Sequence, residues 1–444
     1  MPTDDLPLPT REVMVKHICK GLSRYWPNNS HELTAVPVMA VELLPIIGPL
    51  KLQAIQLPDW AKEWGVEGVI LVPSEACRPG DEWKQVDWWL AAFLLLECWH
   101  ERVWELQHEP IHSYSFKLQG WDTRAWERAW VNRIALFLRA WAAQVKDKAP
   151  NEFFGELPLL EIIMTHDVDA ISKTVPIRLK QGAFNLFNAG RHLLKGEISG
   201  AAERIGTATR FLFGNEDWWT FDTLLEMERR SGINAHFNFY ADDRKKNIKS
   251  WLFDPSYDIN TQRVKRLFGQ IKAQHGTIGL HPTFDSWNSA EIIGHQKAQL
   301  TTAAKQSVTT CRQHWLRFGW KDTWGAQENA GIEMDTTLMF NDGPGFRAAV
   351  ATSWMPWAQQ NSQAQKLLAL PTVIMDSHFF DYRHMDEVER KTSMRHWLNE
   401  VRSVHGQIAV LWHPHTLTKD YGWMAGFQEL IDTIREIQEC PHLH

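Results

Sequence analysis

The feature that most constrains the fold is a series of short apolar runs, separated by helical patterns, that begins near residue 159. Such an alternation is typical of a parallel sheet or barrel whose strands are connected by helices. Each run ends in or close to a polar residue, and an α/β barrel carries its active site at the carboxyl ends of its strands. The runs span residues 160–164, 235–240, 277–280, 368–375 and 408–412.

The length of 444 residues is too great for one ordinary core and indicates two or three domains. We expect a boundary near residue 155, with an accessory domain at 1–155 and a catalytic domain at 156–444. The accessory domain should be a smaller α/β unit, because an apolar strand at 69–72 precedes helical patterns at 87–106 and 126–145.

Charge and cysteine usage exclude several classes of protein. Lys and Arg number 47 against 53 Asp and Glu, which argues against a nucleic-acid partner. Five scattered cysteines without a CxxC pair indicate a reducing compartment. The first residues lack the basic and apolar regions of a signal peptide, and prolines interrupt the longest apolar stretch. We therefore expect a cytoplasmic protein without a spanning segment.

Polar side chains follow three of the apolar runs directly. Asp167 and Asp169 follow the first run, His281 and Asp285 the third, and His413 the last. Carboxylates and imidazoles bind zinc and other first-row metals, and two neighbouring carboxylates can divide metal binding and proton transfer between them. Each group taken singly has a structural alternative, such as a loop cap. Their occurrence at three strand ends favours one metal-dependent site.

Five segments in order carry a further signal: 165–169 (THDVD), 279–286 (GLHPTFDS), 316–318 (LRF), 331–337 (GIEMDTT) and 411–413 (LWH). They resemble the motifs of the polysaccharide deacetylases, the NodB-homology domains of carbohydrate esterase family 4. The resemblance implies a distorted (β/α)7-type barrel that removes acetyl groups from sugars with a divalent metal. Residues 335–347 and 412–416 resemble a bacterial subgroup with an extra N-terminal domain, associated with surface or extracellular polysaccharide biosynthesis.

Catalytic roles follow from the positions in these motifs. The resemblance implies that Asp167 is the catalytic base and that His413 is the general acid. It implies that Arg317 orients the base and that Asp335 is the partner in the fourth motif. The residues alone leave open an ordinary buried ion pair between Arg317 and Asp335, and His415 could replace His413.

The metal ligands implied by the resemblance are Asp169, His281 and Asp285. The family has a histidine where this chain has Asp285, so the ligand set would be more anionic than the usual one. Zinc is our first choice for the ion. The sequence leaves open a role in the site for His166, for His314 and, toward an anionic substrate, for Arg347.

Two further features have alternative interpretations. Most of the 24 tryptophans should lie in the core, although a helix bearing Trp88, Trp89, Trp99 and Trp104 could instead lie on a membrane surface. Tryptophans near the motifs, namely Trp218, Trp219, Trp354 and Trp357, could stack on sugars. The basic stretch 173–210 is either an amphipathic insertion or a solvated helix face.

The leading hypothesis is a cytoplasmic, metal-dependent deacetylase of an acetylated sugar or glycan that is an intermediate of a surface polysaccharide. One alternative is a non-catalytic carbohydrate-binding relative, in which Asp285 replaces a metal-binding histidine. Another is a hydrolase of a different C–N bond, such as that of a cyclic amide. Association with a membrane surface or a biosynthetic complex is left open.

Overall fold

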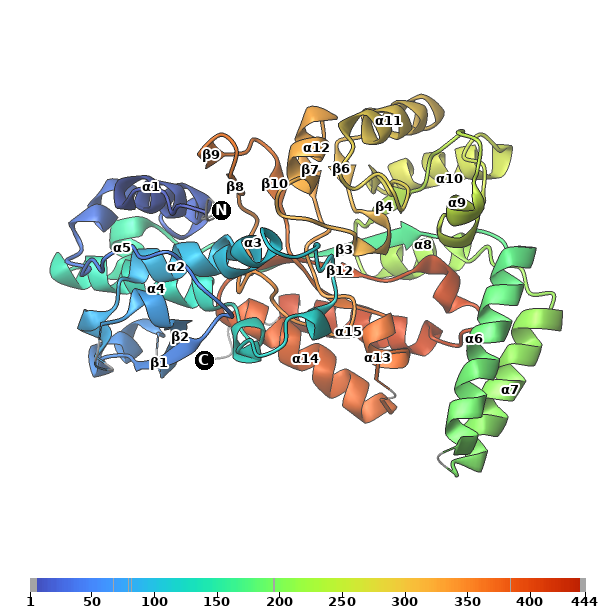
Figure 1. The fold of residues 1–444 in the computed structure, drawn as a ribbon, viewed down its shortest axis with the longest axis horizontal. Coiled ribbons are helices and arrows are strands. Elements are labelled where there is room, and N and C mark those ends of the chain that lie inside the picture. The colour runs from blue at the N-terminus through green and yellow to red at the C-terminus, as the bar shows by residue number, and fades with distance from the viewer. Residues whose placement is uncertain are drawn as a thin grey trace.

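The centre of the molecule is a parallel sheet of eight strands with helices around it (Figure 1). The computed structural model describes residues 6–66, 68–78, 80, 82–194, 196–383 and 385–439. Neighbours in the sheet follow the order β10-β7-β6-β5-β4-β3-β12-β11. The strands are β3 (Glu161–Val168), β4 (His236–Phe239), β5 (Thr277–Leu280), β6 (Thr310–Cys311), β7 (Met334–Asp335), β10 (Leu368–Ala369), β11 (Thr372–Met375) and β12 (Gln407–Leu411).

The two outer strands of this sheet belong to one segment of chain. The run 368–375, expected as a single strand, is interrupted at Pro371, which has no N–H to donate to a neighbouring strand. Its first half pairs with β7 and its second half with β12, so the segment joins both ends of the sheet. Counted once, the segment makes a seven-strand barrel, and the expected α/β fold class is confirmed.

Helices cover the outside of the barrel because its strands are apolar on both faces. All four residues of β11 are buried, as expected for a parallel strand between helices. Short elements at the rim are α9 (Ile248–Phe253), α13 (Ser377–Phe380) and the pair β8 (Trp357–Ala358) and β9 (Gln363–Ala364). The outer helices are α8 (Phe221–Arg230), α10 (Gln262–Ala273), α11 (Ala290–Ala304), α12 (Thr323–Asn329), α14 (Glu387–Ser403) and α15 (Met424–Glu439).

The described residues of the N-terminal part form an antiparallel pair of strands, five α-helices and several short 3-10 turns. The helix expected at 87–106 is divided at Cys98, whose left-handed backbone (φ 44°) ends the first segment. Every residue of that segment is buried, and so is Trp99, so Trp88, Trp89 and Trp99 belong to the core and not to a membrane surface, and Trp104 packs half-buried against the same core. The elements are α1 (Arg11–Gly21), β1 (Leu52–Gln56), β2 (Val69–Pro73), α2 (Trp88–Leu96), α3 (Trp99–Glu105), α4 (Trp130–Val145) and α5 (Pro150–Phe154).

The N-terminal part packs against the barrel through one continuous hydrophobic core. Buried polar contacts cross the same interface: the Tyr25 hydroxyl donates to the Val404 carbonyl at 2.6 Å. Arg347 donates to Glu101 at 2.8 Å. This buried ion pair accounts for Arg347, which therefore does not face a substrate. The boundary near residue 155 stays a prediction.

A helical hairpin extends away from the barrel at the opposite end of the molecule (Figure 1). It consists of α6 (Val175–Leu194) and α7 (Ile198–Phe213) and follows β3 in the chain. Small side chains, Gly182 and Ala189 on α6 and Ala201 on α7, let the two helices pack closely. No helix in the described part of the chain has the length and apolar character needed to cross a bilayer.

Candidate metal centre

Three side chains from three strand ends meet in one cluster. His281 Nε2 lies 3.2 Å from Asp169 Oδ1, and His314 Nε2 lies 3.5 Å from the same oxygen. Asp169 follows β3, His281 follows β5, and His314 lies three residues beyond β6. Both imidazoles are buried, whereas the side chain of Asp169 is 29% exposed. The cluster therefore opens to solvent on the side of Asp169.

The hydrogen bonds around the cluster fit a cation. His281 Nδ1 lies 2.7 Å from the Arg312 carbonyl, and His314 Nδ1 lies 3.3 Å from Asp254 Oδ1. Because both acceptors require a proton on Nδ1, each neutral ring directs the lone pair of Nε2 toward Asp169. Asp169 Oδ1 is itself buried, and no hydrogen-bond partner for it lies among the described residues. One carboxylate and two imidazoles facing one another are a donor set suited to zinc.

The charged groups of the cluster shift the pKa values of Asp169 and His281 in opposite directions. Burial raises the pKa of Asp169, but the imidazoles of His281, His314 and His413 outweigh burial and lower it. Burial lowers the pKa of His281, but the carboxylates of Asp167 and Asp169 outweigh burial and raise it. Protons and a cation thus compete for the same ligand atoms, so metal binding should release protons.

Asp167 lies beside the cluster and is held in a fixed orientation. Its Oδ1 accepts from Asn238 Nδ2 at 2.9 Å and lies 3.3 Å from Arg312 Nη1. Its Oδ2 faces His281 Nδ1 at 3.9 Å. Arg312 is fully buried and also donates to the Thr165 hydroxyl at 2.7 Å. The carboxylate of Asp167 is therefore positioned by one amide and one guanidinium.

His413 reaches the cluster from β12. Its Nε2 lies 3.6 Å from Asp169 Oδ2, and its Nδ1 lies 2.9 Å from Asp376 Oδ1. Burial lowers the pKa of His413, but the carboxylates of Asp376, Asp169 and Asp167 outweigh burial and raise the pKa to about 10. His413 therefore carries a proton at neutral pH and directs Nε2 toward the cluster.

His314 reaches the cluster through an unusual turn. Strand β6 has only two residues, and a 3-10 turn at His314–Leu316 follows it closely. Trp315 and Leu316 both have a positive φ, 58° and 50°, in the left-handed region that bulky residues rarely occupy. Such strain persists where the surrounding structure holds it, and it is frequent at functional sites.

The structure places Asp285 outside the cluster, contrary to the expected ligand set. Asp285 forms an ion pair with Lys249 at 2.6 Å, and its side chain is 46% exposed. The group of side chains that could hold a metal ion includes His314 in its place. The reason is local: Asp285 lies beyond the end of β5, in a turn that directs its carboxylate to α9.

Arg317 and Asp335 also lie away from Asp167. Arg317 stacks on the ring of Phe284 at 4.1 Å and contacts His112 at 3.1 Å. Asp335 is buried and accepts from Trp324 Nε1 at 3.0 Å and from Gln327 Nε2 at 2.8 Å. The structure therefore shows Arg312, and not Arg317, in contact with Asp167, and it shows no ion pair between Arg317 and Asp335 among the described residues.

Two histidines near the cluster, His166 and His415, are held by contacts with residues outside the cluster. His166 points to the outer face of β3, as strand alternation requires beside Asp167, and its Nε2 lies 2.5 Å from Glu228 Oε1 on α8. His415 stacks on Trp218, and burial followed by the charge of His413 lowers the pKa of His415 to about 4. Neither histidine contacts the metal-ligand atoms.

The tryptophans near the motifs are mostly part of the core. Trp218, Trp354 and Trp357 are at most 5% exposed, so they offer no open ring to a sugar. Trp219 is partly exposed, but Arg263 covers its ring at 4.1 Å. The interpretation of these tryptophans as sugar platforms is therefore not supported by their burial.

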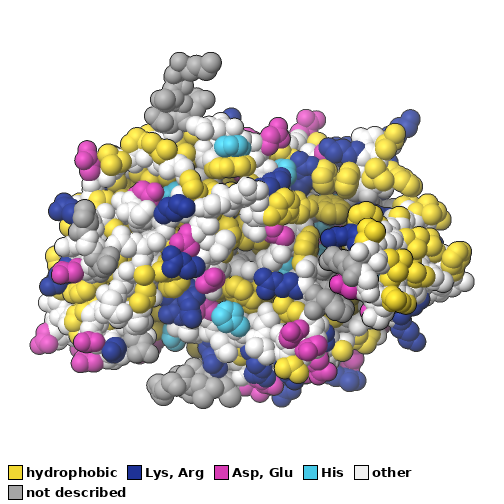
Figure 2. All heavy atoms as spheres, turned by 60° about the horizontal axis from the view of Figure 1, so that its bottom comes forward, with side chains coloured by type: hydrophobic (Ala, Val, Ile, Leu, Met, Phe, Trp, Pro, Cys, Tyr) yellow, Lys and Arg dark blue, Asp and Glu magenta, His cyan; other side chains and the backbone are white. Residues whose placement is uncertain are grey.

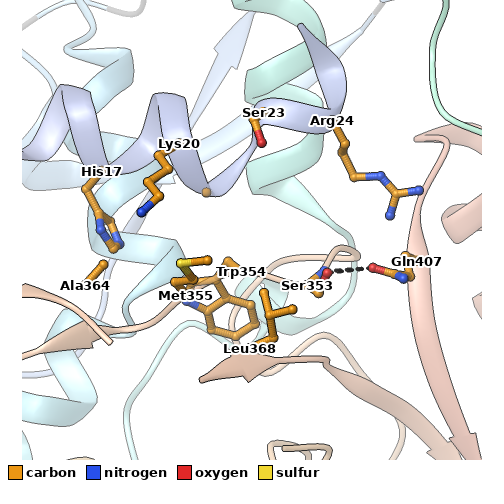
Figure 3. A pocket seen from close by; sticks show the side chains of 11 residues that line it. His17, Lys20, Ser23, Arg24, Ser353, Trp354, Met355, Ala364, Leu368 and Gln407 are labelled. Atoms are coloured by element: carbon orange, nitrogen blue, oxygen red, sulfur yellow. Dashed lines mark hydrogen bonds between the residues drawn. The ribbon is translucent and has the colours of Figure 1, made fainter. Parts of the chain in front are cut away.

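A cavity elsewhere in the molecule is separate from this cluster. It measures about 320 Å³ and lies between the end of α1 and the barrel (Figure 3). Lys20, Arg24 and Ser353 are among the side chains at its walls, and Ser353 is bonded to Gln407 at 2.7 Å. Its lining includes none of the cluster residues, so the cavity and the cluster are separate features.

No family model matches the chain, and no curated protein matches it. Among solved structures, the chain is similar to a putative polysaccharide deacetylase from Mycobacterium smegmatis, with 16% identity, coverage of 62% of this chain and 83% of that chain, and a TM-score of 0.36. It is similar to the CE4 domain of a xylanase from the hindgut metagenome of Trinervitermes trinervoides, with 9% identity, 63% and 84% coverage, and a TM-score of 0.29. It is also similar to a CE4 family pseudoenzyme from Bacillus anthracis, with 11% identity, 63% and 61% coverage, and a TM-score of 0.28. These similarities are low and carry no argument about activity.

Proposed function

We propose that the protein is a metal-dependent hydrolase that removes an acetyl group from an acetylated sugar or glycan. The observation that carries the proposal is the cluster of Asp169, His281 and His314, with Asp167 and His413 beside it. The resemblance of the strand-end motifs to polysaccharide deacetylases supports the choice of substrate. Action on a surface-polysaccharide intermediate in the cytoplasm is part of the same proposal.

Asp169, His281 and His314 would hold the metal. A divalent cation there supplies a Lewis acid that polarises a carbonyl group and lowers the pKa of water. His281 and His314 bind through Nε2 because hydrogen bonds at Nδ1 fix their tautomers. The side chains beside these three ligands, Asp167 and His413, would transfer the protons.

Asp167 and His413 supply the base and the acid. Asp167 accepts the proton of the attacking water, because Asn238 and Arg312 hold Oδ1, while Oδ2 lies 3.9 Å from Nδ1 of the cluster residue His281. His413 is protonated at neutral pH and gives a proton from Nε2 to the departing nitrogen or oxygen. Asp376 keeps the His413 ring in place through Nδ1.

The alternative of a non-catalytic carbohydrate-binding relative depended on Asp285. It had Asp285 replace a metal-binding histidine, and under the present proposal His314, 3.5 Å from Asp169 Oδ1, would take that histidine's role. A hydrolase of a cyclic amide would use the same base, acid and metal. Acetylated sugars and cyclic amides are therefore compared in the test.

The test measures metal and activity on the same full-length preparations. We expect about one zinc per chain and release of acetate from at least one N- or O-acetylated sugar. Asp167→Asn should keep the metal and reduce kcat by about 10²-fold or more. Thermal unfolding of each variant shows whether the fold is retained. A protein without metal and without acetate release would refute the proposal, and hydrolysis of a cyclic amide alone would change the substrate.

A further inference from the structure

The hairpin of α6 and α7 exposes many large apolar side chains. Leu194 is 91% exposed and Ile198 is 75% exposed, and both lie at the tip of the hairpin. Further exposed apolar residues follow along α6: Leu179, Leu186, Phe187 and Leu193. Figure 2 shows hydrophobic side chains gathered over this end of the molecule. A contiguous exposed apolar area of this kind marks an interaction surface.

The exposed apolar side chains belong to a hairpin whose two helices pack well against each other. The inner sides of the two helices meet through small residues, as described above. Arg178 fixes the base of the hairpin, because its guanidinium donates to the carbonyls of Leu212 at 3.1 Å and Gly214 at 2.7 Å. The apolar residues on the opposite side of α6 therefore face solvent while the hairpin itself is complete.

The charge of this segment favours an anionic partner. Residues 175–213, the two helices and their connection, contain six Lys or Arg and two Glu, a net charge of plus four, whereas the rest of the chain carries minus ten. Arg191 on α6 and Arg210 on α7 are exposed. Anionic lipid headgroups attract such a segment, whereas the same hairpin on a second copy would repel it. A helix with apolar and basic residues side by side is typical of binding in the plane of a membrane surface.

A second short helix extends the same surface toward the metal centre. Ile248 and Trp251 on α9 are 81% and 49% exposed. Lys180 of α6 joins the two helices: its Nζ donates to the Leu252 carbonyl at 3.4 Å and lies 4.9 Å from the ring of Trp315. Trp315 directly follows the cluster residue His314. The apolar surface and the opening of the cluster are therefore neighbours.

We propose that this surface, made of the outer side of α6, the hairpin tip and α9, docks on a lipid bilayer with anionic headgroups. The apolar side chains enter the boundary between headgroups and acyl chains, and the basic side chains contact the headgroups. The metal centre then opens beside the lipid surface. The docking does not depend on the proposed hydrolysis and can be tested without a substrate.

The experiment is co-sedimentation of the full chain with vesicles of phosphatidylglycerol and phosphatidylcholine in equal amounts, and with vesicles of phosphatidylcholine alone. We expect binding to the anionic vesicles only, and its loss at high salt. Leu194→Asp with Ile198→Asp should weaken binding at least about tenfold, since both apolar anchors are lost. The control is Leu44→Asp with Ile47→Asp, which replaces side chains that are 61% and 84% exposed on the N-terminal part.

The control variant should bind as the unchanged chain does, and both variants should unfold at the original temperature. Equal binding of all three proteins would refute the proposal, as would binding to neither vesicle or to both vesicles equally. Sedimentation velocity adds a further outcome. If the chain self-associates and only Leu194→Asp with Ile198→Asp abolishes this, the surface is a protein contact and the proposal is wrong.

Discussion

His413 Nδ1 lies 2.9 Å from Asp376 Oδ1, and the backbone N–H of His413 donates to Asp376 Oδ2 at 2.8 Å. Both oxygens of one buried carboxylate therefore hold a single histidine. The pair fixes the ring and supplies the largest attraction that raises the pKa of His413 to about 10. The carboxylate thus determines both the direction and the protonation of the proposed acid.

Asp376→Asn should lower the pKa of His413, because an amide does not attract the protonated ring. We expect kcat to fall by about 10²-fold and the alkaline limb of the pH profile to move to lower pH. Nitrogen NMR of the imidazole reports the pKa directly. An unchanged alkaline limb with a normal fold would show that another group controls it.

The same substitution should change stability with a definite pH dependence. The folded pKa of His413 is raised above 6.5, so its contribution to stability is complete below about pH 6.5 and is lost as pH rises through about 10. The difference in free energy of unfolding between the two proteins should shrink over that range. Denaturant unfolding at several pH values measures it.

His314→Ala and Asp285→Ala form a matched pair for the metal centre. His314 faces Asp169, so its loss should remove the bound metal and the activity together. Asp285 pairs with Lys249 at the surface, where an ion pair contributes about 0–1 kcal/mol, so its loss should leave the metal content unchanged. Metal analysis of both proteins checks the prediction. The reverse result would return Asp285 to the ligand set.

Gly279→Ala should disturb the proposed base from a distance. A Cβ at this position would collide with Asn238 Oδ1 and Thr310 Oγ1. The shift should displace the amide that holds Asp167 and destabilise the fold by about 1–3 kcal/mol. We expect kcat to fall more than KM rises. Gly269→Ala, where nothing lies within 4 Å, is the control and should not reduce activity.

Glu105 should make the protein less stable at high pH. Burial, together with the nearby charge of Glu101, raises the pKa of Glu105 to about 8. The folded state therefore binds a proton between about pH 4.5 and 8, and stability falls as pH rises through that range, by up to about 1.4 kcal/mol per pKa unit. Glu105→Gln should remove this dependence. Glu109→Gln, at an exposed position, should follow the unchanged protein in urea unfolding.

The barrel and its strand ends could be predicted from the sequence because short buried strands leave a direct apolar signal. Asp167 lies at the end of such a strand, and Asp169, His281 and His413 each follow one, so the four side chains come together. The division of the helix at Cys98 could not be seen in the same way. A single left-handed residue there leaves the hydrophobic pattern intact.

The sequence does not indicate Arg312 or Asp376 as site residues and only leaves a role for His314 open, for identifiable physical reasons. Strand β6 has two residues, too few for a clear pattern, so Arg312 and His314 were not placed at a strand end. The backbone at Trp315 and Leu316 then takes a left-handed path that no local preference predicts. Asp376 had a visible signal, since it directly follows the apolar run 368–375.

The interrupted segment around Pro371 has a consequence for how the barrel tolerates change. The backbone of this segment also bonds to residues outside the sheet: Ala369 exchanges hydrogen bonds with Trp354, and the Thr372 N–H donates to the Leu338 carbonyl. A proteolytic cut or an insertion at Pro371 would uncouple β10 from β11, which lie at the two ends of the sheet. Each end could then become an edge strand with unpaired backbone N–H and C=O groups, which favours aggregation. The same change in an outer loop would free neither end.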